Sequence, residues 1–261
     1  MKRRLLGIIL AVGAGILVVQ LWPSAPPPEP ADAPADPPAA PAAESAPVIL
    51  HPMPAPASAG EPPLPALDES DQAVGEALTR VMGVPALPGF LYPDRMIRRF
   101  VATVDNLPRR KLPLQLIPVR PAVGRFAVSG AEPPVRIAPV NAMRYRLQVE
   151  ALEAMDPAAL VDLYVRFYPL FQQAYVELGY PRGYFNDRLM EVLDGLLAAP
   201  ENAGHAELVR PSVMYKFADA DLEALSAGEK ILLRMGEDNA RRVKQVLRAI
   251  RAELVRRAPA R

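Results

Sequence analysis

Proline is concentrated in one stretch of this chain, and that stretch cannot contribute to a packed core. From Pro23 to Ala66, 16 of the 44 residues are proline and many of the others are alanine. Proline has no backbone N–H and its φ angle is fixed, so such a segment favours extended conformations of polyproline II character. The composition therefore predicts a disordered Pro/Ala-rich linker at residues 23–66, between an N-terminal segment (1–22) and a folded domain (67–261).

An almost uninterrupted apolar run precedes the linker. It extends from Leu5 to Trp22, and its only polar side chain is that of Gln20. As a helix the run is about 27 Å long, close to the roughly 30 Å of a bilayer's hydrocarbon core. The residues before it, Lys2 to Arg4, are cationic, and cationic ends stay in the cytoplasm. The sequence predicts a single-pass anchor in the bacterial inner membrane, with the C-terminal domain in the periplasm.

Two alternatives concern this N-terminal segment. The first is a cleaved signal peptide, but cleavage after Ala25 would place Pro23 where the peptidase prefers a small residue, so we favour an uncleaved anchor. The second is a homodimer of two anchors. Gly7, Ala11 and Gly15 follow the small-xxx-small spacing that lets membrane helices approach closely. Small residues are common in membrane spans, so composition alone is the more ordinary explanation of this spacing.

The charge and the cysteine content exclude several functions. The formal net charge is only +1, and the positive excess of the domain is too small to argue for nucleic-acid binding. The chain has no cysteine, which excludes disulfide bonds, thiolate metal sites, a cysteine nucleophile and an acylated cysteine. We therefore expect no nucleic-acid partner, and nothing in the composition implies a cofactor or a metal.

The periodicity of apolar residues predicts a mainly α domain. In one segment Met143, Leu147 and Leu152 are expected along one apolar side, and in the next Pro169 predicts a kink or a break. A capping box at Ser226 predicts the start of a single long final helix, which continues to about residue 257. The other predicted helices span residues 71–82, 95–107, 141–155, 157–178 and 185–200.

The segments between these helices contain short β-prone pieces. LQLI (114–117), RFAV (125–128) and VRIA (135–138) lie in a proline-rich stretch that predicts loop with room for one small β-hairpin, and ELVRPSVMYKF (207–217) predicts a short strand. No regular alternation of strand and helix suggests a parallel sheet. The predicted fold is a transmembrane helix, a disordered linker and a helical globular domain.

Several runs of the domain are long enough to compare with known families. They are FVATVDNLPRRKLP (100–113), NAMRYR (141–146), LYVRFYPLFQQAYVELGYP (163–181), FNDRLMEVLDGLLAAPE (185–201) and LVRPSVMYKFADADLEALSAGEKILLRMGEDNA (208–240). Together they resemble a domain-of-unknown-function family (3014) of proteobacterial proteins. The resemblance implies one N-terminal span, a Pro-rich tether and a helical periplasmic domain. It implies no catalytic residue.

Enzyme motifs are absent from the sequence. Of the two histidines, His51 lies in the predicted linker and is expected not to be a ligand, while His205 lies in a loop after a helix. A Ser-His-Asp triad would need His205, but the chain has no G-x-S-x-G elbow. The patterns H-E-x-x-H, the glycine-rich phosphate loop and the EF-hand are also absent.

The best polar constellation in the sequence is acidic. Asp187, Glu191 and Asp194 have the i, i+4, i+7 spacing that places three carboxylates on one helix face. Two carboxylates act as acid and base in glycoside hydrolysis, and glycan is a natural substrate in the cell wall. A solvated acidic face that pairs with arginines from elsewhere is the more common explanation. The three residues are therefore candidates, and no catalytic residue is assigned.

Two further groups have both a packing and a binding interpretation. The aromatic residues of 164–175 recur at helical spacing, which favours a core over a ligand groove. Between Glu229 and Arg261 the chain has ten Lys and Arg residues but only four acidic residues. Arg241 and Arg248 are candidates to bind an acidic partner or anionic lipid, although a solvated basic side of a packed helix is more common.

The sequence is most consistent with a non-enzymatic protein of the cell envelope, anchored in the inner membrane. It would bind or scaffold an envelope protein or a cell-wall component. The alternative is an enzyme that acts on envelope glycan or lipid through the carboxylates near Asp187.

Overall fold

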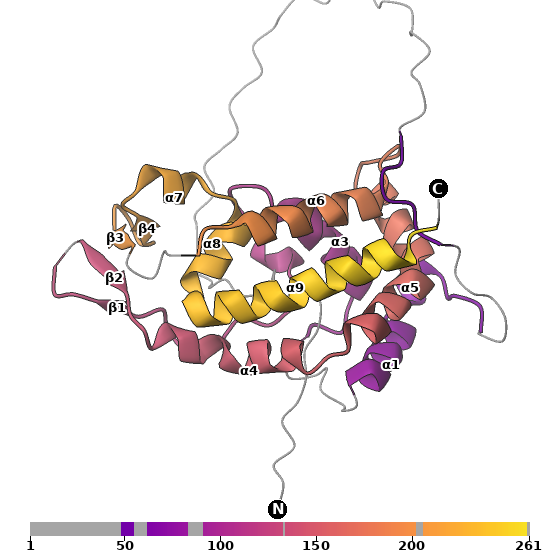
Figure 1. Ribbon diagram of the computed structural model, residues 1–261, viewed down its shortest axis with the longest axis horizontal. Helices are drawn as coiled ribbons and strands as arrows, with labels where there is room; N and C mark the ends of the chain where they lie inside the picture. Colours follow the sequence, from indigo (N-terminus) through magenta and orange to yellow (C-terminus); the bar gives the residue numbers. More distant parts are fainter. Residues whose placement is uncertain (1–47, 55–61, 83–90, 133, 202–205, 260–261) are drawn as a thin grey trace, which may run out of the picture.

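The part of the chain that can be described is mainly helical, as the sequence predicts (Figure 1). A computed structural model describes residues 48–54, 62–82, 91–132, 134–201 and 206–259. The predicted membrane span from Leu5 to Trp22, with the pairing residues Gly7, Ala11 and Gly15, lies outside these residues. Within the described part, no helix combines the length and the apolar character that crossing a membrane requires.

Four helices form the centre of the domain: α3 (Met96–Asn106), α5 (Pro157–Glu177), α6 (Phe185–Ala198) and α9 (Glu237–Arg257). α5 packs against α3 and α9, and α6 packs against the same two helices, while α1 lies on α5 and α4 lies along α9. Two short 3-10 turns are also present: η1 (Leu67–Glu69) precedes α1, and η2 (Leu114–Leu116) follows α3. The other helices of the described residues are α1 (Asp71–Met82), α4 (Asn141–Glu153), α7 (Ala220–Ala224) and α8 (Ala227–Arg234).

The aromatic residues of α5 form the centre of the core, as their spacing predicts. Phe171 meets Phe100 of α3 edge to face at 5.4 Å and stacks on Phe185, the first residue of α6, at 6.0 Å. Such pairs add about 0.5–1.5 kcal/mol to the burial of each ring. They also fix the start of α6 against α5. The buried aromatic residues of α5 are Tyr164, Phe167, Tyr168, Phe171 and Tyr175.

α5 is one continuous helix through Pro169, so of the predicted kink or break, the break does not occur. Asp156 caps it by accepting the N–H of Ala158 at 3.0 Å, and Pro157 occupies the first turn, where a missing N–H costs nothing. A proline inside a helix costs about 3 kcal/mol because one hydrogen bond is lost. Burial of apolar side chains on both sides of Pro169 offsets this cost.

The predicted single final helix is two helices. The capping box forms as predicted, because Ser226 Oγ accepts the N–H of Glu229 at 3.2 Å and the Glu229 carboxylate accepts the N–H of Ser226 at 2.9 Å. α8 nevertheless ends at Arg234, and α9 begins after Gly236. Gly236 has a φ of 91°, a left-handed conformation that ends a helix and that glycine adopts without strain.

A small antiparallel sheet contains the predicted hairpin, as the pair β1 and β2, and extends it with two strands from the segment where one short strand was predicted. Its strands, in the order β1-β2-β3-β4, are β1 (Val128–Ser129), β2 (Val135–Ile137), β3 (Glu207–Val209) and β4 (Lys216–Phe217). Val135 pairs with Leu208, which joins the RFAV and VRIA pieces to the distant ELVRPSVMYKF segment. The LQLI piece is not a strand and contains η2.

One prediction about α4 is wrong. Met143 and Leu147 are 67% and 41% exposed, although they were expected to share an apolar side with Leu152. The helix instead turns Tyr145, Val149 and Leu152 inward, at the i, i+4, i+7 spacing of one helix face. This face packs along α9.

Candidate functional site

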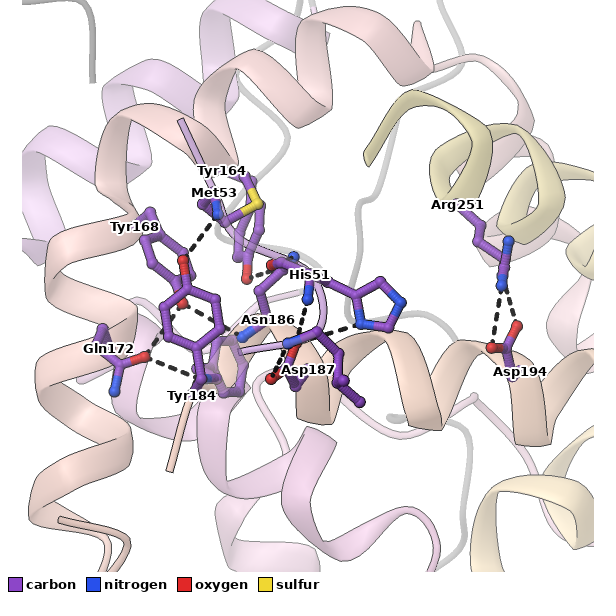
Figure 2. A network of polar contacts seen from close by, with 12 residues as sticks. His51, Met53, Tyr164, Tyr168, Gln172, Tyr184, Asn186, Asp187, Asp194 and Arg251 are labelled. Carbon is purple, nitrogen blue, oxygen red and sulfur yellow. Dashed lines mark hydrogen bonds and ion pairs between the residues drawn. The ribbon is translucent and has the colours of Figure 1, made fainter. Parts of the chain in front are cut away.

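A segment of the predicted linker lies across the first turn of α6 (Figure 2). We call residues 48–54 the strap. The backbone N–H groups of Leu50 and His51 donate to the two carboxylate oxygens of Asp187, at 3.1 and 2.7 Å. The side-chain amide of Asn186 donates to the His51 carbonyl oxygen at 2.8 Å. Two neighbouring side chains of α6 therefore bind both the donors and an acceptor of the strap's backbone.

Two further contacts hold the strap. The Met53 N–H donates to the Tyr184 hydroxyl at 2.8 Å, and the Met53 side chain is partly buried against the core. The His51 ring places Nδ1 at 3.2 Å from Asp187 Oδ1. His51 was expected not to be a ligand, and its contacts here are with Asp187 through the backbone N–H and the ring. The other histidine, His205, lies outside the described residues.

Side chains of α5 position the residues that bind the strap. The Tyr164 hydroxyl donates to Asn186 Oδ1 at 3.2 Å, which leaves the amide nitrogen of Asn186 directed at the strap. α6 has no side-chain cap of its own, and Gln172 Oε1 accepts the N–H of Phe185 at 2.9 Å in place of one. Because Asn186 is only 2% exposed, its orientation is fixed by these contacts and not by solvent.

Burial keeps the supporting phenols protonated. It raises the pKa of Tyr164 well above the ordinary value, and the neighbouring Tyr168 and Tyr184 add to the effect. Burial and a hydrogen bond with Tyr184 likewise raise the pKa of Tyr168. Both hydroxyls therefore remain available as donors at neutral pH, and Tyr168 donates to Gln172 at 3.1 Å.

Cavities flank the strap on two sides. One, of about 190 Å³, lies between the strap and the end of α9 and is lined by Pro52, Met190, Leu254 and Val255. The other, of about 580 Å³, lies over α6 and is mostly polar in its lining residues. Leu50 and His51 line both cavities. The remaining residues of the larger cavity are Asp105, Tyr175, Tyr180, Tyr184, Asp187, Arg188, Glu191 and Asp194.

A buried carboxylate forms part of the larger cavity. Asp105 is 2% exposed, and its Oδ2 atom receives hydrogen bonds from Arg109 at 2.6 Å and from the Tyr180 hydroxyl at 3.1 Å. Arg188 Nε lies 3.4 Å from Oδ1 of the same carboxylate. Burial opposes the charge of Arg188, but its hydrogen bond to Glu191 and the attraction of both carboxylates raise its pKa. These charges are paired with one another across α3 and α6.

The three carboxylates that the sequence singled out have three different partners. Asp187 binds the strap, and Glu191 pairs with Arg188 at 2.8 Å. Asp194 makes a two-pronged contact with Arg251 of α9, in which Nη2 and Oδ2 are 3.1 Å apart. All three line the larger cavity, but each is engaged by its own partner, whereas the acid and the base of a glycosidase must act together on one bond.

The two predicted binding arginines lie on α9. Arg241 is exposed and pairs with Glu237 at 3.1 Å and with Asp238 at 3.3 Å, and Arg248 is also exposed. A role for them in binding stays a prediction. Across the described ranges, no three His, Asp or Glu residues are grouped so that they could hold a metal ion.

The fold and this site define a mainly helical domain that holds a short chain segment, bent at Leu50 and His51, at the start of one helix. The model of a family described as "Protein of unknown function (DUF3014)" matches residues 96–251, and the chain therefore belongs to this family. No curated protein and no solved structure matches the chain. The matched region includes Tyr184, Asn186 and Asp187, whereas the strap precedes it.

Proposed function

We propose that this chain is a membrane-anchored periplasmic protein of the bacterial cell envelope, whose helical domain binds a short segment of a protein partner and catalyses no reaction. The observation that supports this proposal is the strap. Asp187 and Asn186 bind consecutive backbone groups of a short segment that bends at Leu50 and His51, so the segment is recognised through its main chain. We call Tyr184, Asn186 and Asp187 the cradle.

The energies of these contacts suit reversible binding. A hydrogen bond to a charged group contributes about 1.5–3 kcal/mol, and one between neutral groups about 0.5–1.5 kcal/mol. Ordering each residue of a flexible segment costs about 1–2 kcal/mol in backbone entropy. The favourable and unfavourable contributions are of similar size, so a segment in the cradle can exchange with another.

The contacts of the carboxylates favour binding over catalysis. An enzyme acting on envelope glycan or lipid would need two of Asp187, Glu191 and Asp194 free to act together. Arginines engage Glu191 and Asp194, and the strap engages Asp187. The anchor and the linker, which are predictions from the sequence, would hold such a binding domain near partners in the envelope.

Photo-crosslinking in intact cells tests the proposal with a matched pair of exposed valines. Val255 of α9 is 51% exposed and lines the cavity beside the strap. Val213, between β3 and β4, is 58% exposed and lines neither cavity beside the strap. A crosslinking residue at position 255 of the full chain should capture a discrete envelope protein, and one at 213 should not.

The variant Asp187→Asn gives the decisive comparison. It replaces an acceptor of two backbone N–H groups with a side chain that has one acceptor and one donor group, so it should abolish the crosslink from position 255. Equal capture from both positions, or capture that survives Asp187→Asn, would overturn the proposal.

A further inference from the structure

We propose that the strap is a tethered competitor of the partner, and that the partner's segment shares its chemistry: an apolar residue, any residue except proline, a proline and a second apolar residue. In the strap these are Leu50, His51, Pro52 and Met53. The inference rests on the proposed function of the cradle. It adds what the partner segment must contain and what it must displace.

The contacts of the strap set the pattern. The N–H groups of positions 50, 51 and 53 all donate to the cradle, so none of these positions can be proline. Position 52 needs no N–H for this contact, and proline there lowers the conformational entropy that the free segment loses on binding. The Met53 side chain packs partly buried against the core, which calls for an apolar residue.

The composition of the linker sets the strap apart from its surroundings. Between Pro23 and Ala66 the large aliphatic residues are Val48, Ile49, Leu50, Met53 and Leu64, and four of these five belong to the strap. A segment that served only as a spacer would have no need of such a cluster. Of these four, Met53 is partly buried against the core, whereas Val48, Ile49 and Leu50 are exposed, and the cradle binds the strap through its backbone. The occupied cradle indicates a built-in ligand.

The strap leaves room for a better ligand. Leu50 is 55% exposed and Ile49 is 46% exposed, and cavities of about 190 and 580 Å³ remain on two sides of Leu50 and His51. A partner segment with larger side chains at the positions of Leu50 and His51 would fill these two cavities. The strap has the compensating advantage of its covalent attachment to the domain, because a tethered segment acts at an effective concentration of the order of mM.

Fluorescence anisotropy with a labelled Val-Ile-Leu-His-Pro-Met-Pro peptide tests the competition. The full chain in detergent micelles is compared with a full chain in which residues 48–54 are replaced by Gly-Ser repeats of equal length. The replaced chain should bind the peptide at least about tenfold more tightly than the wild type, since its cradle is open. Equal binding to both chains, or no binding to the replaced chain, would overturn the inference.

Two modified peptides separate main-chain recognition from recognition of the imidazole. N-methylation of the histidine amide removes the donor of the 2.7 Å bond to Asp187 and should weaken binding by at least about tenfold. Replacement of the histidine by alanine keeps that donor and should weaken binding by no more than about threefold. The reverse order of effects would contradict the proposed pattern.

The crosslink from position 255 distinguishes this inference from the proposed function. In cells, replacement of the strap should increase capture of the partner. If capture is unchanged, the domain binds its partner and the strap does not compete, so the inference fails while the proposed function stands. If wild type and replaced chain both fail to capture a partner, the proposed function fails as well.

Discussion

The Asp187 carboxylate accepts the His51 N–H at 2.7 Å, although 136 positions of sequence separate the two residues. The carboxylate lies in the first turn of α6, where the helix dipole favours a negative charge. When the strap leaves, Asp187 is therefore still stabilised by the helix and by water. This is the physical reason why we expect the contact to open without unfolding the domain.

The amides of the strap should respond to changes in the cradle. Asp187→Asn removes an acceptor from two N–H groups, so hydrogen exchange at Leu50 and His51 should become at least about tenfold faster in the full chain. Hydrogen-exchange mass spectrometry of the peptide that contains the strap measures this change.

Glu191→Gln is the matched control for that experiment. Glu191 lies one turn further along α6 and pairs with Arg188, not with the strap. Exchange in the strap should therefore stay at the wild-type rate. An equal effect of both variants would mean that the charge of α6, and not the contact at Asp187, protects the strap.

The sequence did not predict that the strap packs on the domain. The prolines of the strap resemble those of the linker, and a single histidine among them does not indicate a binding partner. The group of large apolar residues around the histidine was the feature of the sequence that could have indicated packing.

The spacing of Asp187, Glu191 and Asp194 predicted a shared helix face, but their partners come from the strap, from α6 itself and from α9. Sequence spacing within one helix cannot predict partners from other elements.

The fold itself was predicted best where local signals are strong. The capping box predicted at Ser226 is observed. The break at Gly236 was missed because apolar spacing continues on both sides of it. The small hairpin and the short strand were predicted, but their union into one sheet was not, because β2 and β3 are distant in sequence and strands of two or three residues are too short for an alternating pattern.

Removal of one hydroxyl on α5 should loosen the strap indirectly. Tyr164→Phe leaves Asn186 Oδ1 without its donor in a buried place, which should lower the free energy of unfolding by about 1–3 kcal/mol. It also frees the Asn186 amide to turn away from His51, so exchange in the strap should accelerate. Urea denaturation and hydrogen exchange measure the two effects. Tyr145→Phe, at a buried tyrosine of α4, is the control and should leave exchange in the strap unchanged.

The apolar face of α9 should hold the domain together, and its basic face should not. Leu247 is 7% exposed, and truncation to alanine should cost about 2–5 kcal/mol. The double charge reversal Arg241→Glu/Arg248→Glu concerns exposed side chains and should change stability by about 0.5 kcal/mol. Urea midpoints of the full chain compare the two. A silent leucine variant, or unfolding caused by the arginine pair, would contradict the assignment of these faces.

The predicted topology can be tested independently of the site. A reporter that is active only outside the cytoplasm, fused after Arg261, should be active in cells. The same fusion without residues 1–22 should lose that activity and leave the membrane fraction. Activity of a cytoplasm-only reporter in the intact chain would contradict the periplasmic placement of the domain.

The buried Tyr175 should make the domain sensitive to alkali. Burial, reinforced by the negative charge of Asp105, raises the pKa of this phenol to about 12, against an ordinary value of about 10. Below pH 10 the phenol is protonated in both the folded and the unfolded chain, so its contribution to stability is fully present. As the pH rises from 10 to about 12, the unfolded state loses this proton and the folded state keeps it, so the free energy of unfolding falls.

Tyr175→Phe should remove this part of the loss of stability. The melting temperature of the variant should therefore fall less between pH 9 and pH 11.5 than that of the wild type, and the phenolate absorbance of the two proteins should differ by one late-titrating group. Parallel curves for both proteins would show that Tyr175 ionises in the folded state as it does in the unfolded one.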